Sequence, residues 1–317
     1  MVVALAGGVG AARMLTGLIQ VAPPERIMAI VNTGDDVTLH GLHISPDLDT
    51  VTYTLAGAVN AETGWGLAGE TWATMDELAR YGSGRLAWFR LGDRDLATHL
   101  YRTSRLHEGA TLSQVTAEIA GRWQVGVRVV PMSDDPVETR VTVGGVEIGF
   151  QDYFVGRRHD VAVESIRFAG IQNARPSPGV LDAIDSADVV VICPSNPLVS
   201  IAPVLSVPGI EDAIAARRAD VVAVSPIVAG HAIKGPADRL LAELGHEASA
   251  VGVARLYARI AGTLVIDETD AGLAKAVEAE GLHCIVAPTI MRGPAEAAAL
   301  ARVVLAAPGL ATREAAR

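Results

Sequence analysis

The residues best suited to chemistry gather in a short segment that follows the apolar run "IMAIV" at 27–31. Within fifteen positions lie Asp35, Asp36, His40, His43, Asp47 and Asp49. Such a group of carboxylates suits Mg²⁺, which takes oxygen ligands and usually shares its shell with substrate phosphates. The alternatives are a solvated turn at the first aspartate pair and a helix N-cap at the second, ahead of a helix expected near 50–59. The two histidines are either solvated loop residues or partners of the site's carboxylates, and we favour the first.

A glycine-rich turn precedes the acidic segment. Gly7, Gly8 and Gly10 follow an expected strand and open a helix, where backbone amides and the helix N-terminus favour a phosphate group. Arg13 near the start of this helix is suited to pair with phosphate oxygens. Position 13 would be glycine in a dinucleotide fingerprint, and no Gly-Lys-Ser/Thr follows the turn, which excludes a P-loop. A tight turn without a ligand is the alternative.

Polar groups also follow other expected strands. The phrase "NTGDD" adds Asn32, Thr33 and Gly34 to the first aspartate pair, which suits a metal-bound phosphate better than the single acidic residue of a NAD site. The phrase "PSNP" supplies Ser195 and Asn196, uncharged groups that could bind a base, a ribose or the edge of a flavin-like ring. Because ligands of parallel sheets bind outside the carboxyl ends of the strands, we expect these loops to share one crevice.

A third polar segment, "LGDRDLATHL" at 91–100, lies in a region expected to be helical. Its charges form either a surface face or a second wall of the site, and the residues alone leave both open. The sequence has no Ser–His–Asp or Cys–His pattern and no G-x-S-x-G elbow. Cys193 lies in an apolar strand and is expected in the core. The chemistry indicated is therefore transfer between bound substrates, driven by positioning and metal electrostatics.

The elements that must position these residues alternate between strands and helices. Strands are expected at 2–6 and 27–31, and at the start of 187–197, 219–227, 263–269 and 283–290, where each runs into a polar or proline-containing loop. Helices are expected at 11–21, 210–217, 236–244 and 271–280. Near-continuous Val/Ile runs indicate strands that are covered on both faces, so the pattern predicts an α/β fold with a doubly wound parallel sheet. We expect a single domain over 1–317, with a mainly helical insertion at 62–125 and a β-hairpin within 136–155.

Composition limits the class of protein. The chain has 317 residues, half of them apolar, a net charge of −10 and only 4% aromatic residues. This balance argues against a general nucleic-acid binder, which carries a basic face. Two distant cysteines form no disulfide framework, and neither a signal peptide nor an apolar run long enough to span a bilayer is evident. We expect a cytoplasmic protein without membrane or nucleic-acid partners.

Taken together, the motifs resemble one family. The segments that carry the resemblance are, in order, "ALAGGVGAARML", "NTGDD", "PDLDTVTYTLAG", "WFRLGDRDLATHL", "PSNPLVSIAPVL" and "SPIVAGHAIKGP". Over about residues 2–305 the chain resembles the CofD/FbiA family, the 2-phospho-L-lactate transferases of coenzyme F420 biosynthesis. The resemblance implies a Rossmann-like parallel sheet with an inserted smaller lobe, a requirement for Mg²⁺, and a homodimer.

The resemblance also implies an activity. The family transfers a phospho-acid from a guanosine-diphosphate-activated donor to Fo, a deazaflavin with a ribityl chain, and releases GMP. The donor carries lactate in CofD-type members, giving F420-0, and enolpyruvate in FbiA-type members, giving dehydro-F420-0. The motifs leave this choice open here. The in-line attack of the terminal hydroxyl of Fo on the donor's distal phosphorus would be helped by Arg13 and the loop amides.

Residue roles follow the matched motifs. Asp49 corresponds to the family's aspartate that binds Fo and the metal, and we expect Asp35 and Asp47 to complete the metal site. Arg90 stands where the family often has a lysine that contacts Fo, and guanidinium and ammonium groups differ in geometry. Asp93 is the other expected Fo-binding residue, while "GGVG", "NTGDD" and the Ser195–Asn196 pair match the donor side.

Two other functions remain alternatives on the sequence alone. A nicotinamide-dependent oxidoreductase could use the same fold, although the missing third glycine counts against it. A nucleotide-sugar-binding regulator like the YvcK-like relatives of the family would share the glycine turn and the sheet. Such a regulator should lack the "LGDRDLATHL" and "PDLDT" segments, which are present here.

Overall fold

Runs of valine and isoleucine form the centre of the fold. The computed structural model describes residues 1–81 and 87–307. In this part of the chain seven parallel strands form one sheet, in the order β14 (His283–Val286), β13 (Thr263–Ile266), β10 (Val221–Val224), β9 (Val189–Ile192), β1 (Val2–Ala6), β2 (Ile27–Val31) and β5 (Arg128–Pro131). The predicted α/β fold with a parallel sheet is confirmed. The edge strand β5 was not predicted.

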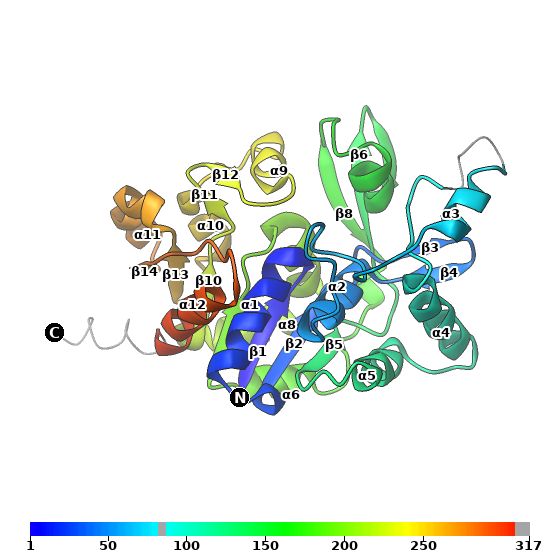
Figure 1. The fold of residues 1–317 in the computed structure, drawn as a ribbon. Coiled ribbons are helices and arrows are strands. Elements are labelled where there is room, and N and C mark those ends of the chain that lie inside the picture. The colour runs from blue at the N-terminus through cyan, green and yellow to red at the C-terminus, as the bar shows by residue number, and fades with distance from the viewer. Residues whose placement is uncertain (82–86, 308–317) are drawn as a thin grey trace.

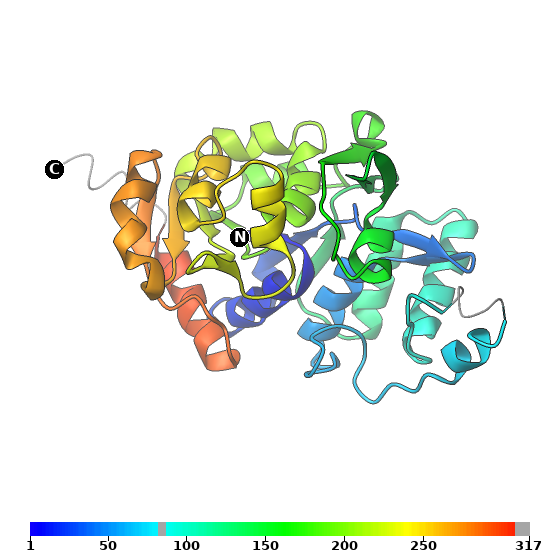
Figure 2. The same cartoon turned by 90° about the horizontal axis from the view of Figure 1, so that it is seen from above.

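Helices cover both faces of the sheet. Successive side chains of each strand point to opposite faces, so they enter two separate cores. Val3 and Leu5 of β1 enter one core, and Val2 and Ala4 enter the other. The first face is covered by α6 (Val180–Asp185), α7 (Ala202–Ser206), α8 (Ile210–Ala216), α9 (Ala237–Glu243), α10 (Ala250–Tyr257) and α11 (Ala274–Ala279). The second is covered by α1 (Gly8–Val21), α2 (Pro46–Leu55), α5 (Leu112–Arg122) and α12 (Pro294–Ala306). Figures 1 and 2 show this layered arrangement.

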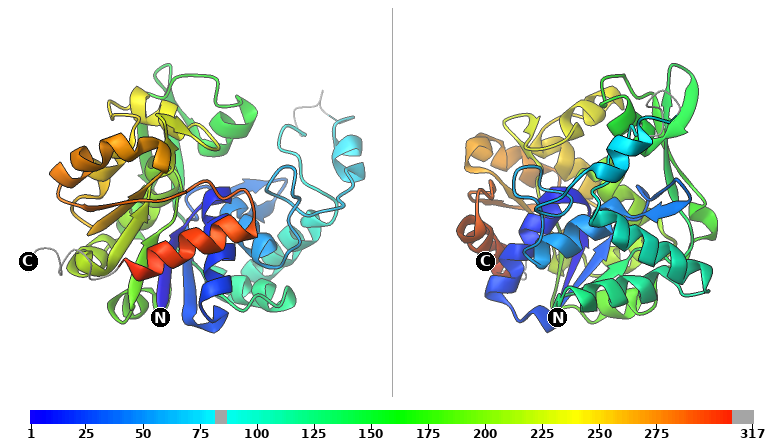
Figure 3. Two further views of the ribbon diagram at one scale, coloured as in Figure 1. Left: turned by 60° about the vertical axis from the view of Figure 1, so that its left-hand side comes forward. Right: turned by 45° about the vertical axis from the view of Figure 1, so that its right-hand side comes forward.

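Helices α1 and α12 lie side by side although they come from opposite ends of the described chain (Figure 3). Gly17 makes this close approach possible, since a Cβ there would overlap the carbonyl oxygen of Ala297. Met14 and Leu18 of α1 join Leu300 and Val304 of α12 in one apolar core. The two helices therefore close the second face of the sheet as a unit.

The helix that carries the second aspartate pair begins earlier than expected. In place of the helix expected near 50–59, α2 spans Pro46–Leu55 and follows Ser45. Proline favours the first helical position because its fixed φ suits the helix and its missing N–H needs no partner there. Both Asp47 and Asp49 consequently lie in the first turn of α2.

Smaller elements project beyond the carboxyl ends of the parallel strands (Figure 1). They include the predicted hairpin of β6 (Glu138–Val143) and β7 (Val146–Gly149), turning at Gly144-Gly145, which β8 (Ser165–Ala169) extends to three strands. Two further hairpins, β3 (Val37–Leu39) with β4 (Leu42–Ile44) and β11 (Ile227–Val228) with β12 (His231–Ala232), were not predicted. Short helical turns complete the chain at Pro24–Arg26, Asp152–Gly156, Ile171–Asn173, Pro197–Ile201, Arg218–Asp220 and Glu268–Leu273.

The segment 62–125 is less helical than expected. It holds α3 (Ala73–Leu78), α4 (Asp95–His107) and α5, but 62–72 and 87–94 form turns and loops. Leu112 of α5 enters the core on the second face of the sheet, so α5 belongs to the helical layer that covers this face. The division into one domain with these insertions stays a prediction, and part of it lies outside the described residues.

No single helix in the described part of the chain is long and apolar enough to cross a membrane. One sharply bent pair, Pro197–Ser206 with Ile210–Ala216, meets that test together on length and composition.

Candidate active site

A pocket of about 600 Å³ lies at the carboxyl ends of the strands. The chain runs from β1 towards β2 on one side and returns to β9 on the other, so the strand order reverses between β1 and β9. Ligands of open α/β sheets bind at such a switch point. Residues after five strands line the pocket: Gly7, Gly8 and Gly10 after β1, Asp35 after β2, Ser195 and Asn196 after β9, Ser225 after β10, and Thr289 after β14.

The glycine turn packs tightly against neighbouring groups that leave no room for larger residues. Gly8 has a φ of 68°, a conformation that glycine adopts without strain, and its amide donates a 2.8 Å hydrogen bond to Asp47 Oδ1. A Cβ on Gly7 would lie 2.9 Å from Asp47 Oδ2, and one on Gly10 would overlap the carbonyl oxygen of Pro194. The carboxylate of Asp47 thus occupies the N-terminus of α1, where an anion is favourable. One of the amides expected to hold a phosphate is therefore already used.

Asp35 and Asp47 form a buried acidic pair. Asn32 donates a 3.0 Å hydrogen bond to Asp47 Oδ2 and accepts one from the amide of Gly34, while Asp35 Oδ1 is buried without a hydrogen-bond partner among the described residues. Burial and then the charge of Asp47 raise the pKa of Asp35 well above its usual range, and burial raises the pKa of Asp47 to about 6. Since no described basic side chain forms an ion pair with either carboxylate, the pair suits a bound cation.

Asp36 points away from the pocket and binds the β3–β4 hairpin. Its Oδ2 lies 2.9 Å from His43 Nε2 and accepts a 2.7 Å hydrogen bond from Ser45. Burial raises the pKa of Asp36, and the contact with His43 opposes this effect. His43 is partly exposed, and its contact with Asp36 favours the alternative, a partner of a carboxylate, whereas His40 is exposed at the hairpin turn as expected. Together, His43 and Ser45 anchor the loop that leads into α2.

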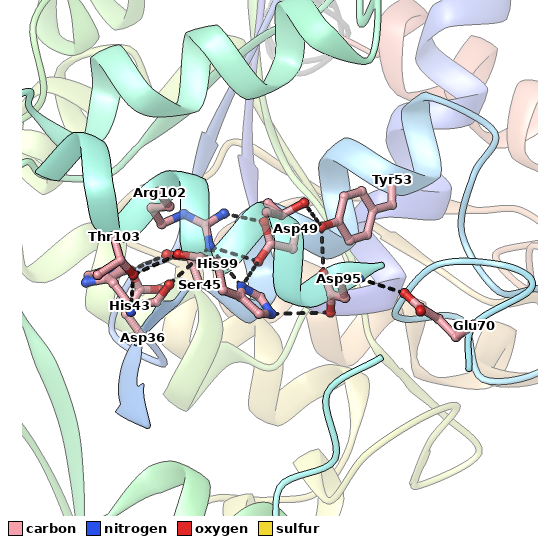
Figure 4. A network of polar contacts seen from close by, with 11 residues as sticks. Asp36, His43, Ser45, Asp49, Tyr53, Glu70, Asp95, His99, Arg102 and Thr103 are labelled. Atoms are coloured by element: carbon pink, nitrogen blue, oxygen red, sulfur yellow. Dashed lines mark hydrogen bonds and ion pairs between the residues drawn. The ribbon is translucent and has the colours of Figure 1, made fainter. Parts of the chain in front are cut away.

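Asp49 belongs to a second buried network (Figure 4). The guanidinium of Arg102, which is 1% exposed, donates to both carboxylate oxygens of Asp49, at 3.1 Å from Nη1 to Oδ2 and through a shorter contact from Nη2 to Oδ1. His99 Nδ1 lies 3.7 Å from Asp49 Oδ2, and His99 Nε2 lies 3.4 Å from Asp95 Oδ2. One donor atom each from Asp49, Asp95 and His99 lies within 4.8 Å of the others, close enough to share a metal ion.

Tyr53 closes the network towards the pocket. Its hydroxyl donates a 2.6 Å hydrogen bond to Asp95 Oδ1. Burial and the charges of Asp49 and Asp95 raise the pKa of Tyr53, so its hydroxyl keeps its proton and remains a donor. Burial opposes ionisation of Asp95, but the nearby His99 and the hydrogen bond from Tyr53 lower its pKa overall. The helix α2 thus directs Asp47 to the glycine turn and Asp49 to α4, since residues two apart do not share a helix face.

Aromatic side chains also line the pocket. Although aromatic residues are scarce in the chain, six of them lie in the lining: Tyr53, Trp65, Trp88, Phe89, Phe150 and Phe154. The rings of Phe150 and Phe154 stack with centroids 5.5 Å apart, and those of Trp88 and Phe89 meet edge to face at 5.6 Å. A pocket lined by carboxylates and aromatic rings suits a ligand with a planar ring and a charged end.

Comparison with known proteins shows the family. Residues 2–290 match the family model described as 2-phospho-L-lactate transferase CofD. The chain belongs to the CofD family. It is thus a transferase, and the resemblance seen in its motifs is confirmed.

Curated relatives cover almost the whole chain. The CofD-family protein is 50% identical over 311 residues to the phosphoenolpyruvate transferase of Streptomyces griseus, covering 96% of this chain and 97% of that protein. It is 40% identical over 316 residues to the phosphoenolpyruvate transferase of Mycolicibacterium smegmatis, covering 95% and 96%. Among solved structures, a UPF0052-family protein from Bacillus halodurans matches with a TM-score of 0.62 and 18% identity, covering 96% of this chain and 98% of that one. The last match shows the fold alone.

In this CofD-family chain the other predicted donor-side residues fall into two groups. Arg13 lines the pocket, and its only described hydrogen bond is a long one of 3.4 Å from Nη1 to the carbonyl of Met291. Ser195 and Asn196 also line the pocket, but Ser195 Oγ donates to Gly7 O at 2.8 Å and Asn196 Oδ1 accepts from the amide of Leu198. The second group does not line the pocket and consists of Asn32, Thr33, Gly34 and Asp36.

The two residues expected to bind Fo differ in position. Arg90 lines the pocket and pairs with Asp76 at 3.0 Å. Asp93 does not line it, and its carboxylate accepts hydrogen bonds from Thr71 Oγ1 and from the amides of Ala73 and Thr74. These bonds lower the pKa of Asp93 and cap α3. Fo binding by Asp93 stays a prediction without a supporting contact.

Sequence reasoning missed Tyr53, Arg102 and the roles of Asp95 and His99. A signal was present, since Asp95 and His99 stand four apart and Arg102 three further on, which places all three on one face of a helix. The sequence alone leaves that segment open between a surface face and a wall of the site. His99 and Arg102 are each 1% exposed, so the structure places this face inside the protein.

Proposed function

We propose that the chain transfers a phosphoenolpyruvyl group from a GDP-linked donor to the terminal ribityl hydroxyl of Fo, forming dehydro-F420-0 in coenzyme F420 biosynthesis. The relatives named phosphoenolpyruvate transferase favour this donor, and the family description keeps the phospholactyl donor, which gives F420-0, as the second candidate. The observation that carries the proposal is the pocket itself, which lies at the switch point of the sheet and is lined by both carboxylates and aromatic rings.

The residues fit the Mg²⁺ ion that the family implies. Asp35 and Asp47 are buried carboxylates without a described ion-pair partner, and Asp35 Oδ1 has no hydrogen-bond partner there, so a cation would satisfy both. The cluster of Asp49, Asp95 and His99 is the other candidate, but Arg102 already neutralises Asp49 and Mg²⁺ prefers oxygen to nitrogen ligands. We propose that Asp35 and Asp47 hold the ion, with Asp49 nearby. Bound there, Mg²⁺ would neutralise charge on the diphosphate of the donor.

The substrates are proposed to lie across the pocket. The planar ring of Fo stacks on aromatic side chains of the pocket lining, where Trp88 and Phe154 offer apolar surface. The donor lies over the glycine turn, with its nucleoside towards the loop of Ser195 and Asn196. This orientation brings the ribityl hydroxyl and the diphosphate together beside Asp49.

The proposed reaction is an in-line displacement. The hydroxyl oxygen of Fo forms a bond to the phosphorus that carries the phospho-acid, and the bond from this phosphorus to the oxygen of GMP breaks. GMP departs with that electron pair, and the hydroxyl proton passes to Asp49 or to water. Arg102 fixes the carboxylate of Asp49 through two hydrogen bonds, so its orientation is set before the substrate binds. Positioning supplies most of the catalysis, because phosphoryl transfer needs no covalent enzyme intermediate.

Purified protein with Fo, Mg²⁺ and each donor tests the proposal. We expect GMP release and a product of the mass of dehydro-F420-0, faster with the enolpyruvyl donor than with the lactyl donor. Asp49→Asn should lose most turnover at saturating Mg²⁺. Absence of product with both donors would contradict the proposal, and faster turnover of the lactyl donor would favour the second candidate. The homodimer implied by the family is also a proposal, which light scattering of the purified protein checks.

A further inference from the structure

Lysine is rare in this chain, and one of its lysines lines the pocket. The sequence has only two lysines, Lys234 and Lys275, and its other strongly basic residues are arginines. Lys234 follows β12 and lines the pocket, where its ammonium donates a 2.7 Å hydrogen bond to the carbonyl of Thr63. A Cβ on Gly64 would lie 2.9 Å from Lys234 Nζ and 3.1 Å from Cγ1 of Val9. The ammonium thus lies next to the glycine turn.

Lys234 and Arg13 are both short of negative partners. Among the described residues neither forms an ion pair, whereas Arg90, the third strongly basic residue of the lining, pairs with Asp76. Burial and then the positive charge of Arg13 lower the pKa of Lys234, so the two cations lie close enough to repel each other. Two neighbouring cations without an acidic partner, both facing one pocket, are complementary to a ligand with more than one negative charge.

The backbone amides of the glycine turn cannot by themselves bind the phosphate groups of such a ligand. In other glycine turns the amides at the helix N-terminus bind phosphate, but here the Gly8 amide is bound to Asp47. Asp47 and Asp35 also place negative charge beside the turn, which would repel a bare diphosphate. Positive side chains in this pocket would therefore favour a diphosphate in addition to the proposed Mg²⁺.

We propose that Lys234 and Arg13 together bind the diphosphate oxygens of the donor, and that Lys234 exchanges its hydrogen bond to Thr63 for one to a phosphate oxygen. This inference rests on the proposed function, since it assigns residues to the donor of that reaction. It adds to that function a binding role for Lys234, which lies in the segment "SPIVAGHAIKGP" but was given no role from the sequence. It also makes the loop that carries Thr63 sensitive to whether the donor is bound.

The small number of lysines permits a direct test without turnover. Reductive methylation with ¹³C-formaldehyde labels both lysines and keeps their charge, and Lys234→Arg and Lys275→Arg variants assign the two dimethyl-lysine signals. The probes are GDP with Mg²⁺, pyrophosphate with Mg²⁺, and guanosine. We expect the Lys234 signal to shift with GDP and pyrophosphate but not with guanosine, while the signal of Lys275, which is exposed on α11, stays in place.

Affinity measurements with matched variants complete the test. Lys234→Met and Arg13→Met should each weaken GDP binding by about 10- to 100-fold, the range of a charge-assisted hydrogen bond, while Lys275→Met leaves it unchanged. Far-ultraviolet circular dichroism checks that each variant is folded. A Lys234 signal that ignores both GDP and pyrophosphate, or a Lys234→Met variant that binds GDP as tightly as the wild type, overturns the inference. Neither measurement involves Fo, so failure of the proposed transfer reaction would be seen separately.

Discussion

Arg102 and Asp49 form a buried bidentate ion pair, which joins the first turn of α2 to the middle of α4. Both side chains are buried, so neither charge is solvated by water. Breaking such a pair by removing one partner costs far more than the pair contributes to stability, because the remaining charge stays buried alone. The pair therefore ties the segment that carries the acidic residues to the helix behind it.

A double-mutant cycle tests this pairing. Arg102→Met is expected to lower the free energy of unfolding by about 3–5 kcal/mol, since Asp49 is left without a partner. Adding Asp49→Asn to Arg102→Met should restore part of that loss, because the buried charge is gone. Urea denaturation of the three variants and the wild type measures the coupling. Strictly additive effects would show that the two side chains do not interact.

The carboxyl group of Asp47 should make stability depend on pH. Its pKa is about 6 in the folded protein against 3.8 as the reference, so the folded state binds the proton more tightly than the unfolded state. Stability without metal is therefore expected to rise as pH falls from 7 towards 4, by at most about 1.4 kcal/mol per pH unit from this group. Asp47→Asn should flatten this dependence in EDTA. An unchanged pH profile in that variant would contradict the assignment.

Metal binding should be visible as stabilisation. At pH 7.5, Mg²⁺ at about 100 times its dissociation constant is expected to add about 2.7 kcal/mol to the free energy of unfolding. Asp35→Asn should abolish this effect, and Asp185→Asn, at an exposed position in α6, should leave it intact. Thermal unfolding with and without Mg²⁺ measures both. If Asp95→Asn removed the effect and Asp35→Asn did not, the ion would belong to the cluster around His99.

Gly10 is predicted to be required for packing as well as for any ligand. Gly10→Ala should lower the free energy of unfolding by about 1–3 kcal/mol, because the added methyl group meets the carbonyl of Pro194. Gly121 offers a matched control in α5, since a Cβ there meets nothing within 4 Å. Gly121→Ala should instead stabilise the protein by about 0.4–1 kcal/mol. Equal effects at the two positions, measured by chemical denaturation, would contradict this interpretation.

The sequence predicted the sheet better than the site. Strands such as Val2–Ala6 and Ile27–Val31 are apolar throughout, and an element buried on both faces has few alternatives. The short hairpin at Val37–Leu39 was missed, because three residues carry too little periodicity to recognise. The start of α2 was misplaced because two aspartates in a first turn look like N-caps, although Pro46 is the stronger signal.

The candidate site was predicted only in outline. The post-strand loops could be placed together from topology, and Gly7, Asp35, Asp49 and Ser195 do line one pocket. The partners of each side chain depend on contacts between distant segments, such as Asn32 with Asp47 or Tyr53 with Asp95. No local pattern indicates which carboxylate points to which helix. The same holds for Lys234, whose position beside the glycine turn depends on the path of the β11–β12 loop.

The pairing of α1 with α12 has a consequence for how the protein reaches its native state. Until α12 docks, the side of α1 around Gly17 lacks its cover, and closing a loop of nearly the whole chain carries an entropic cost that must be met before the contact forms. Refolding is therefore expected to be slow and to pass through a species in which this side of α1 is bare, and that species is the one most prone to aggregation.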